Sequence, residues 1–152
     1  MKKLNSVLLA LFLCMFATAC GQKDITIDIE LLTRDLLENV DFEDELSSVD
    51  SDIINSVYGV DSDSVKASAY IGSGATAEEI VVFEAQNNKK AKEALELANK
   101  YIEERKEDFE SYNPKEINKL NNATVLQKDN YIIICVTNDE INANKVINKH
   151  IK

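Results

Sequence analysis

Two adjacent carboxylates, Glu78 and Glu79, follow a glycine-containing stretch and are the residues best able to do chemistry. A carboxylate pair can act as general acid and base when its surroundings raise the pKa of one member. The sequence indicates neither such surroundings nor a further catalytic partner, so we predict no catalytic residue and treat the pair as candidate binding residues. Tyr112, beside Asn113-Pro114, is a third candidate, since an aromatic ring at a helix end either recognises a partner or packs against the fold.

Other motifs lack residues that their chemistry requires. Residues 72–74 (Gly-Ser-Gly) are not followed by Gly-Lys-Ser/Thr, and a strand is expected next, so they indicate a turn rather than a phosphate loop. Residues 50–52 and 61–63 (both Asp-Ser-Asp) resemble the start of a calcium loop, but hydrophobic residues stand at the fifth positions and no glycine at the sixth. His150 is the only histidine, which argues against a catalytic triad or a histidine metal site. We predict no metal and no cofactor.

The first twenty residues have the pattern of an export signal. Lys2 and Lys3 precede a ten-residue apolar run over residues 7–16, which is shorter than the roughly 20 residues of a transmembrane helix. Residues 17–20 (Ala-Thr-Ala-Cys) resemble the lipobox of bacterial lipoproteins, although leucine is commonest where Ala17 stands. The resemblance implies diacylglycerylation of Cys20 and cleavage before it. The alternative is ordinary cleavage and release of a soluble protein with a free Cys20 thiol.

We therefore predict an N-terminal lipid on Cys20 that holds the protein on the extracytoplasmic face of the cell membrane. Two or more acyl chains anchor a protein stably, whereas one binds only marginally. The predicted organisation is a signal peptide over 1–19, a lipidated cysteine and tether over 20–26, and a single α+β domain over 27–152. The tether can extend by at most ~20 Å.

The composition is acidic, with 17 Lys and Arg residues, 27 Asp and Glu residues and a formal net charge of -10. No basic stripe could neutralise phosphates, so nucleic acid is excluded as an expected partner. Residues 20–63 hold 13 acidic residues against only Lys23 and Arg34. Because anionic lipid repels negative charge over ~8–10 Å, we expect the domain to stand off the bilayer.

The three cysteines predict no intramolecular disulfide. Cys14 would leave with the signal peptide, and Cys20 would carry the lipid. Cys135 lies in an apolar run, where a lone thiol behaves as a small hydrophobic residue.

Hydrophobic periodicity predicts two helical segments followed by strand, strand, helix, strand, strand and helix. The expected ranges are a helix over 27–40, helical turns over 41–64, strands over 65–71 and 80–83, a helix from 87 to about 110, strands over 123–127 and 131–137, and a last helix from 138. Thr76 and Glu79 have the spacing of a capping box, which predicts a brief helical turn. The second and fourth strands are the most apolar, which makes them central and predicts the order three, four, two, one.

This arrangement is an α+β fold with a four-stranded, mainly antiparallel sheet, a permuted ferredoxin-like topology. In it both later helices lie on one face of the sheet and the N-terminal helices cover the other.

The run from Tyr58 to Lys152 resembles a family of small bacterial lipoproteins defined only as a domain of unknown function and common in low-GC Gram-positive bacteria. The matching motifs are residues 74–80 (Gly-Ala-Thr-Ala-Glu-Glu-Ile), 111–114 (Ser-Tyr-Asn-Pro) and 128–131 (Lys-Asp-Asn-Tyr). The resemblance implies a location in the cell and a fold but no chemistry, because the family has no assigned activity.

Together these features predict a membrane-anchored, non-catalytic module that binds an envelope protein or a small-molecule ligand. Two alternatives remain open: an envelope hydrolase that uses acidic residues, and a solute-binding accessory protein.

Overall fold

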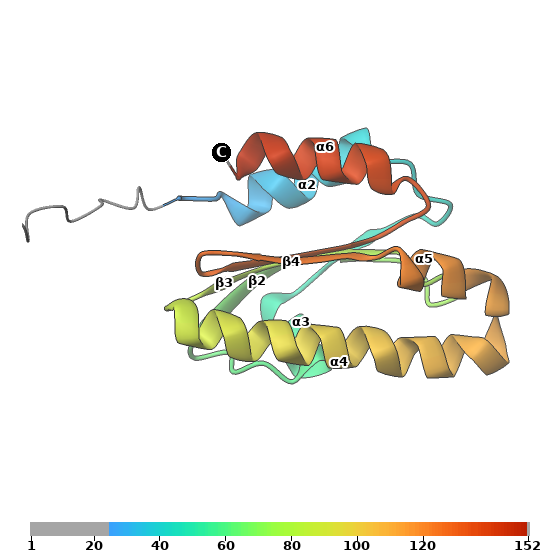
Figure 1. The fold of residues 1–152 in the computed structure, drawn as a ribbon, viewed down its shortest axis with the longest axis horizontal. Coiled ribbons are helices and arrows are strands. Elements are labelled where there is room, and N and C mark those ends of the chain that lie inside the picture. The colour runs from blue at the N-terminus through green and yellow to red at the C-terminus, as the bar shows by residue number, and fades with distance from the viewer. Residues whose placement is uncertain (1–24, 152) are drawn as a thin grey trace, which may run out of the picture.

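The computed structural model describes residues 25–151 (Figure 1). The predictions for residues 1–19 and for Cys20 lie outside these residues. The described chain forms an α+β fold with the following elements in order: α2 (Ile29–Asn39), β1 (Ser47–Val49), α3 (Ser51–Tyr58), β2 (Val65–Ile71), β3 (Glu79–Ala85), α4 (Asn88–Tyr112), the 3-10 helix η2 (Pro114–Glu116), α5 (Ile117–Asn121), β4 (Thr124–Lys128), β5 (Tyr131–Val136) and α6 (Glu140–His150).

Local signals explain where the helices begin and end. Asp28 caps α2 by accepting the backbone N–H of Leu31 at 3.0 Å, and Asn87 caps α4 by accepting that of Lys90 at 3.0 Å. Helix α3 ends at Gly59, whose φ of 71° is left-handed and favours glycine. The predicted capping box is wrong, because Glu79 begins strand β3 instead of a helical turn.

The sheet is antiparallel and has five strands in the order β1-β2-β3-β5-β4. The four predicted strands stand in the predicted order relative to one another, but β1 adds a fifth at the edge of β2. The four-stranded, ferredoxin-like description is therefore inexact, and β2 is not an edge strand. Strand β1 lies in a segment predicted as helical turns. Its sequence did not predict a strand, because three residues are too few to show an alternating pattern.

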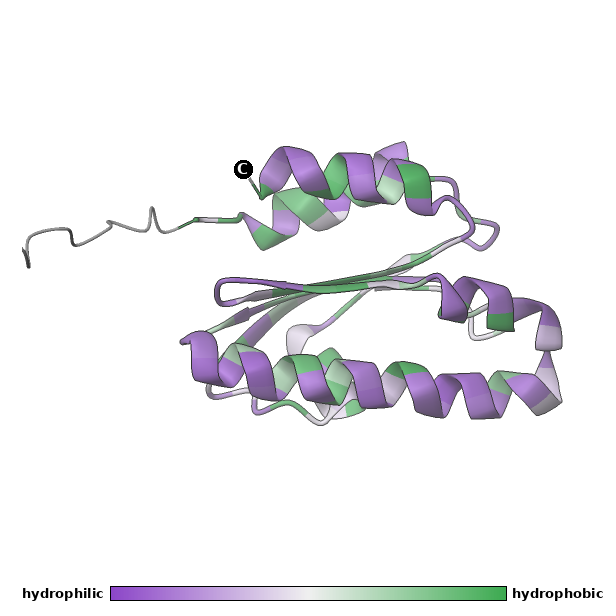
Figure 2. Cartoon of the chain, viewed as in Figure 1, coloured by the Kyte–Doolittle hydropathy of each residue, from purple (hydrophilic) through white to green (hydrophobic). Residues whose placement is uncertain are grey.

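The central strands β3 and β5 are buried along almost their whole length, as their continuous apolar sequences predict. Helices α3 and α4 pack against one face of the sheet, and α2 and α6 against the other (Figure 1). Hydrophobic residues are concentrated on the sheet and on the helix sides that face it (Figure 2). The buried hydrophobic residues form two separate cores, one between α3, α4 and the sheet and the other between α2, α6 and the sheet.

The predicted placement of the helices is wrong in two respects: α4 and α6 lie on opposite faces, and α3 lies on the α4 face. Helix α4 connects two parallel strands, so the handedness of crossovers restricts it to one face. Helix α6 follows the last strand and carries no such restriction. It packs beside α2, where His150 Nε2 lies 2.8 Å from Asp35 Oδ2.

Cys135 is a buried free thiol on β5, which agrees with its predicted role as a small hydrophobic residue. Between residues 25 and 151, no helix combines the length and the hydrophobicity needed to cross a membrane.

Candidate functional site

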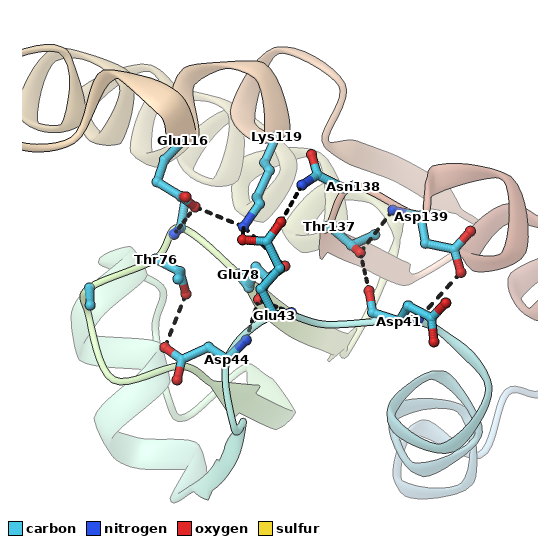
Figure 3. A network of polar contacts seen from close by, with 12 residues as sticks. Asp41, Glu43, Asp44, Thr76, Glu78, Glu116, Lys119, Thr137, Asn138 and Asp139 are labelled. Carbon is cyan, nitrogen blue, oxygen red and sulfur yellow. Dashed lines mark hydrogen bonds and ion pairs between the residues drawn. The ribbon is translucent and has the colours of Figure 1, made fainter.

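Lys119 of α5 lies among three carboxylates at one end of the sheet (Figure 3). Its Nζ is 3.1 Å from Glu43 Oε2 and from Glu116 Oε2, and 3.2 Å from Glu78 Oε1. Glu78 is 1% exposed and Lys119 2% exposed, whereas Glu43 reaches the surface. Burial by itself would lower the pKa of Lys119, but the surrounding carboxylates raise it above the ordinary value. The ammonium is therefore charged at neutral pH and is neither a base nor a nucleophile.

The carboxylates around Lys119 also hold backbone groups. Glu78 Oε2 accepts the N–H groups of Glu43 and Asp44, each at 2.8 Å. Glu116 Oε2 accepts the N–H of Ala77 at 2.8 Å. These contacts join the β2–β3 loop (residues 72–78) to the α2–β1 segment (residues 40–46) and to η2.

Glu79 forms a second buried ion pair, with Arg105 of α4. Its Oε2 lies 3.1 Å from Arg105 Nη1, and its Oε1 accepts a hydrogen bond from the Tyr58 hydroxyl at 3.1 Å. Burial raises the pKa of Glu79, an effect that Arg105 partly offsets, and burial also raises the pKa of Tyr58 well above its usual range. Arg105 Nη2 donates to the Thr76 carbonyl at 3.4 Å, so this pair also holds the β2–β3 loop.

Asp44 binds the same loop from the solvent side. Its Oδ2 accepts hydrogen bonds from Ser73 N at 2.8 Å, Ser73 Oγ at 2.7 Å and Thr76 Oγ1 at 3.0 Å. The Ser73 hydroxyl and amide lower the pKa of Asp44. A Cβ at Gly72 would lie 2.7 Å from Asp44 Oδ2, so a larger residue there would displace the Asp44 carboxylate from its hydrogen bonds to Ser73 and Thr76.

Tyr112 ends α4 beside the same loop and is 70% exposed. Its ring centroid lies 6.1 Å from that of Phe109, and the next residue, Asn113, donates from Nδ2 to the Ala75 carbonyl at 3.2 Å. The structure thus brings the three predicted site residues to one end of the molecule. Glu78 and Glu79 are buried, and only Tyr112 offers its side chain to solvent.

The chain matches a family model described as "Domain of unknown function (DUF4358)" over residues 38–137. It belongs to this family. No curated protein and no solved structure matches the chain. The DUF4358 match confirms the expected domain of unknown function.

The DUF4358 match runs from the end of α2 to the residue after β5, so it contains every residue of the Lys119 and Arg105 ion pairs. Most of α2 and all of α6 lie outside it. Within the described residues, no group of three or more His, Cys, Asp or Glu side chains could hold a metal ion. Both oxygens of Glu78 and of Glu79 are already engaged, so in this arrangement the two carboxylates fix backbone and neighbouring side chains.

Sequence reasoning missed the cationic partners of Glu78 and Glu79. Glu116 and Lys119 have the i, i+3 spacing of a helical ion pair, which is a local signal for one contact. Nothing local indicated that Glu43 or Arg105 would join these groups, because each lies far along the chain from its partner.

Proposed function

We propose that the protein is a bacterial lipoprotein, anchored through Cys20 on the extracytoplasmic face of a Gram-positive membrane, that acts as a non-catalytic interaction module. Its interaction surface is the distal surface, which consists of Tyr112, residues 73–75 of the β2–β3 loop, and Asp41, Glu43, Asp44 and Glu45. The observation that carries the proposal is that an exposed aromatic ring and exposed loop residues stand on a framework held by buried ion pairs.

A surface that is already ordered loses less conformational entropy when a partner binds. The β2–β3 loop donates hydrogen bonds to Asp44 and Glu116 and accepts them from Arg105 and Asn113, and its Glu78 forms an ion pair with Lys119. These residues come from two parts of the chain that are distant in sequence, the α2–β1 segment and the stretch from α4 to α5. Such cross-linking keeps the loop in one conformation, which suits recognition of a folded partner.

The position of the distal surface also suits an anchored protein. The described chain begins near the C-terminus of α6 and the β4–β5 turn, whereas α5 and the β2–β3 loop lie at the opposite end of the sheet (Figure 1). Cys20 precedes Ile25 by five residues, which extend at most ~17 Å. An anchor at Cys20 would therefore hold the Ile25 end close to the bilayer and leave the distal surface facing away from it.

The acidic residues of the distal surface favour a basic partner. Asp41, Glu43, Asp44 and Glu45 belong to the acidic N-terminal part of the chain. The α2–β1 segment that carries them contacts the β2–β3 loop and Lys119, at the end of the sheet opposite the start of the described chain (Figure 1). Their charge would steer a basic partner toward Tyr112 rather than repel the membrane.

The hydrolase alternative is less well supported. Glu78 and Glu79 are 1% and 0% exposed, and each is paired with a cation. A general acid or base must reach the proton that it transfers, and two carboxylates buried to this degree do not reach a substrate at the surface.

A photo-cross-linking amino acid at position 112 of the full-length protein in living cells tests the proposal. We expect one stoichiometric protein partner from position 112, competed by an excess of the unlabelled protein but not of a Tyr112→Ser variant. Position 53 is the matched control, because Ile53 of α3 is 57% exposed and lies outside the distal surface. Equal products from both positions, or none from position 112, would overturn the interaction surface. Mass spectrometry of the mature N-terminus tests the anchor separately, and an unmodified Cys20 would refute it.

A further inference from the structure

A groove of about 520 Å³ lies between α2 and strands β1 and β2. It is distinct from the distal surface, and its volume is typical of small-molecule sites. Unlike most such sites, its lining is mainly polar. A polar lining of this kind selects a ligand that carries charge.

The groove follows from the way α2 covers the sheet. Ile80 and Val82 of β3 are buried beneath α2 and α6, and their partners on β2 are Tyr70 and Ser68, which face the same side. Thr33 of α2 contacts Ser68 through its hydroxyl at 2.7 Å. Helix α2 therefore covers the sheet as far as β2, and the groove lies beside it over β1 and β2.

The lining carries charges of both signs that form no ion pair with another described residue. Arg34 and Glu30 come from α2, and Asp50 comes from the turn between β1 and α3. Among residues 25–151, none of these three side chains makes an ion pair. Glu30 and Arg34 are four residues apart, a spacing at which such groups commonly pair on a helix.

Hydroxyl groups complete the lining. Ser51 Oγ accepts the backbone N–H of Ala67 at 3.0 Å, which leaves its own O–H free to donate. Ser48 lies opposite Tyr70 in the β1–β2 pairing, so both side chains face the groove side of the sheet. Hydroxyl donors and an aromatic ring suit the amide groups of a short peptide.

We propose that this groove binds a short peptide whose two termini are free and charged. The planar guanidinium of Arg34 takes the carboxylate in a two-pronged contact. Glu30 and Asp50 take the ammonium, and the serine hydroxyls bind the amide between them. This site is independent of the proposed partner of the distal surface.

Ligand-observed NMR with the full-length protein in detergent tests the site, with trialanine as the probe. We expect trialanine with both free termini to bind, and its C-terminal amide and its N-acetyl derivative each to bind at least about tenfold more weakly. Arg34→Gln should weaken trialanine binding by about the same factor and leave the already weak binding of the amide unchanged.

Lys92→Gln is the matched control, because it removes one exposed positive charge from α4 on the opposite face of the sheet. It should leave trialanine binding unaltered. Three results would overturn the proposal: no binding of trialanine at about 10 mM, equal binding of the three peptides, or equal effects of Arg34→Gln and Lys92→Gln.

Discussion

Replacing Lys119 by methionine tests whether the buried charges hold the fold together. The substitution keeps most of the side-chain length but removes the ammonium that lies within 3.2 Å of Glu78 and 3.1 Å of Glu116. Both carboxylates are buried, so each would keep its charge without a counter-charge. Removing one partner of a buried ion pair costs about 3–5 kcal/mol. For a domain of this size that corresponds to a fall in Tm of roughly 10–20 °C.

Differential scanning calorimetry at several pH values is the appropriate assay. The quantity measured is the difference in Tm between the Lys119→Met variant and the wild type, compared first at pH 8.

The stability of the wild-type protein should itself depend on pH at the alkaline end, through the protonation of Lys119. The pKa of Lys119 is raised in the fold, so its contribution is fully present below the unfolded lysine pKa of about 10.4 and is lost as pH rises through the folded pKa.

Lys115→Met is the matched control, because Lys115 is exposed on the adjacent η2 turn and makes no ion pair with a described residue. It should change stability by no more than about 0.5 kcal/mol. Adding Glu116→Gln to Lys119→Met should recover part of the loss, since it removes one of the buried charges. If Lys119→Met melts within about 2 °C of Lys115→Met at pH 8, the cluster does not carry the stability assigned to it.

Two further predictions concern the loop and the core. Gly72→Ala should lower stability by about 1–3 kcal/mol, because its Cβ would meet Asp44 Oδ2 at 2.7 Å. In an Asp44→Ala background the same change should cost less stability. If thermal melts show that the two substitutions have additive costs, the contact is contradicted. Burial raises the pKa of Cys135 to about 12, so its thiol should resist alkylation at pH 8. In a variant with serine at positions 14 and 20, a thiol-reactive dye should label Cys135 only after addition of urea, and rapid labelling of the native protein would be inconsistent with a closed core.

Local sequence patterns were sufficient for the elements of the fold and for much of their order. The continuous apolar runs of β3 and β5 require cover on both faces, so their central position follows from composition. The long α4 helix follows from its repeating apolar spacing and its Asn87 cap. The same patterns failed for β1, because a three-residue strand is held by its pairing with β2 rather than by its own sequence.

The candidate site was predicted only in part. Glu78, Glu79 and Tyr112 were singled out as candidate binding residues, and the structure brings them to one end of the sheet, with the two glutamates buried and Tyr112 exposed. Their partners could not be predicted, because Glu79 and Arg105 are separated by 26 residues and no periodic pattern links them.

The sequence by itself determined the periodicity of burial, the acidic composition and the export pattern at the N-terminus, since each is a property of neighbouring residues. Only the tertiary structure decided which charges meet. The α2–β1 segment reaches Glu78 across 35 residues, and Lys119 then joins three carboxylates from separate segments. Likewise, α6 covers the face of the sheet on which it shares a hydrophobic core with α2. The two helices lie far apart in the sequence, so the spacing of residues within either helix does not indicate this face. Such pairings depend on distance in space, which the spacing of residues along a chain does not encode.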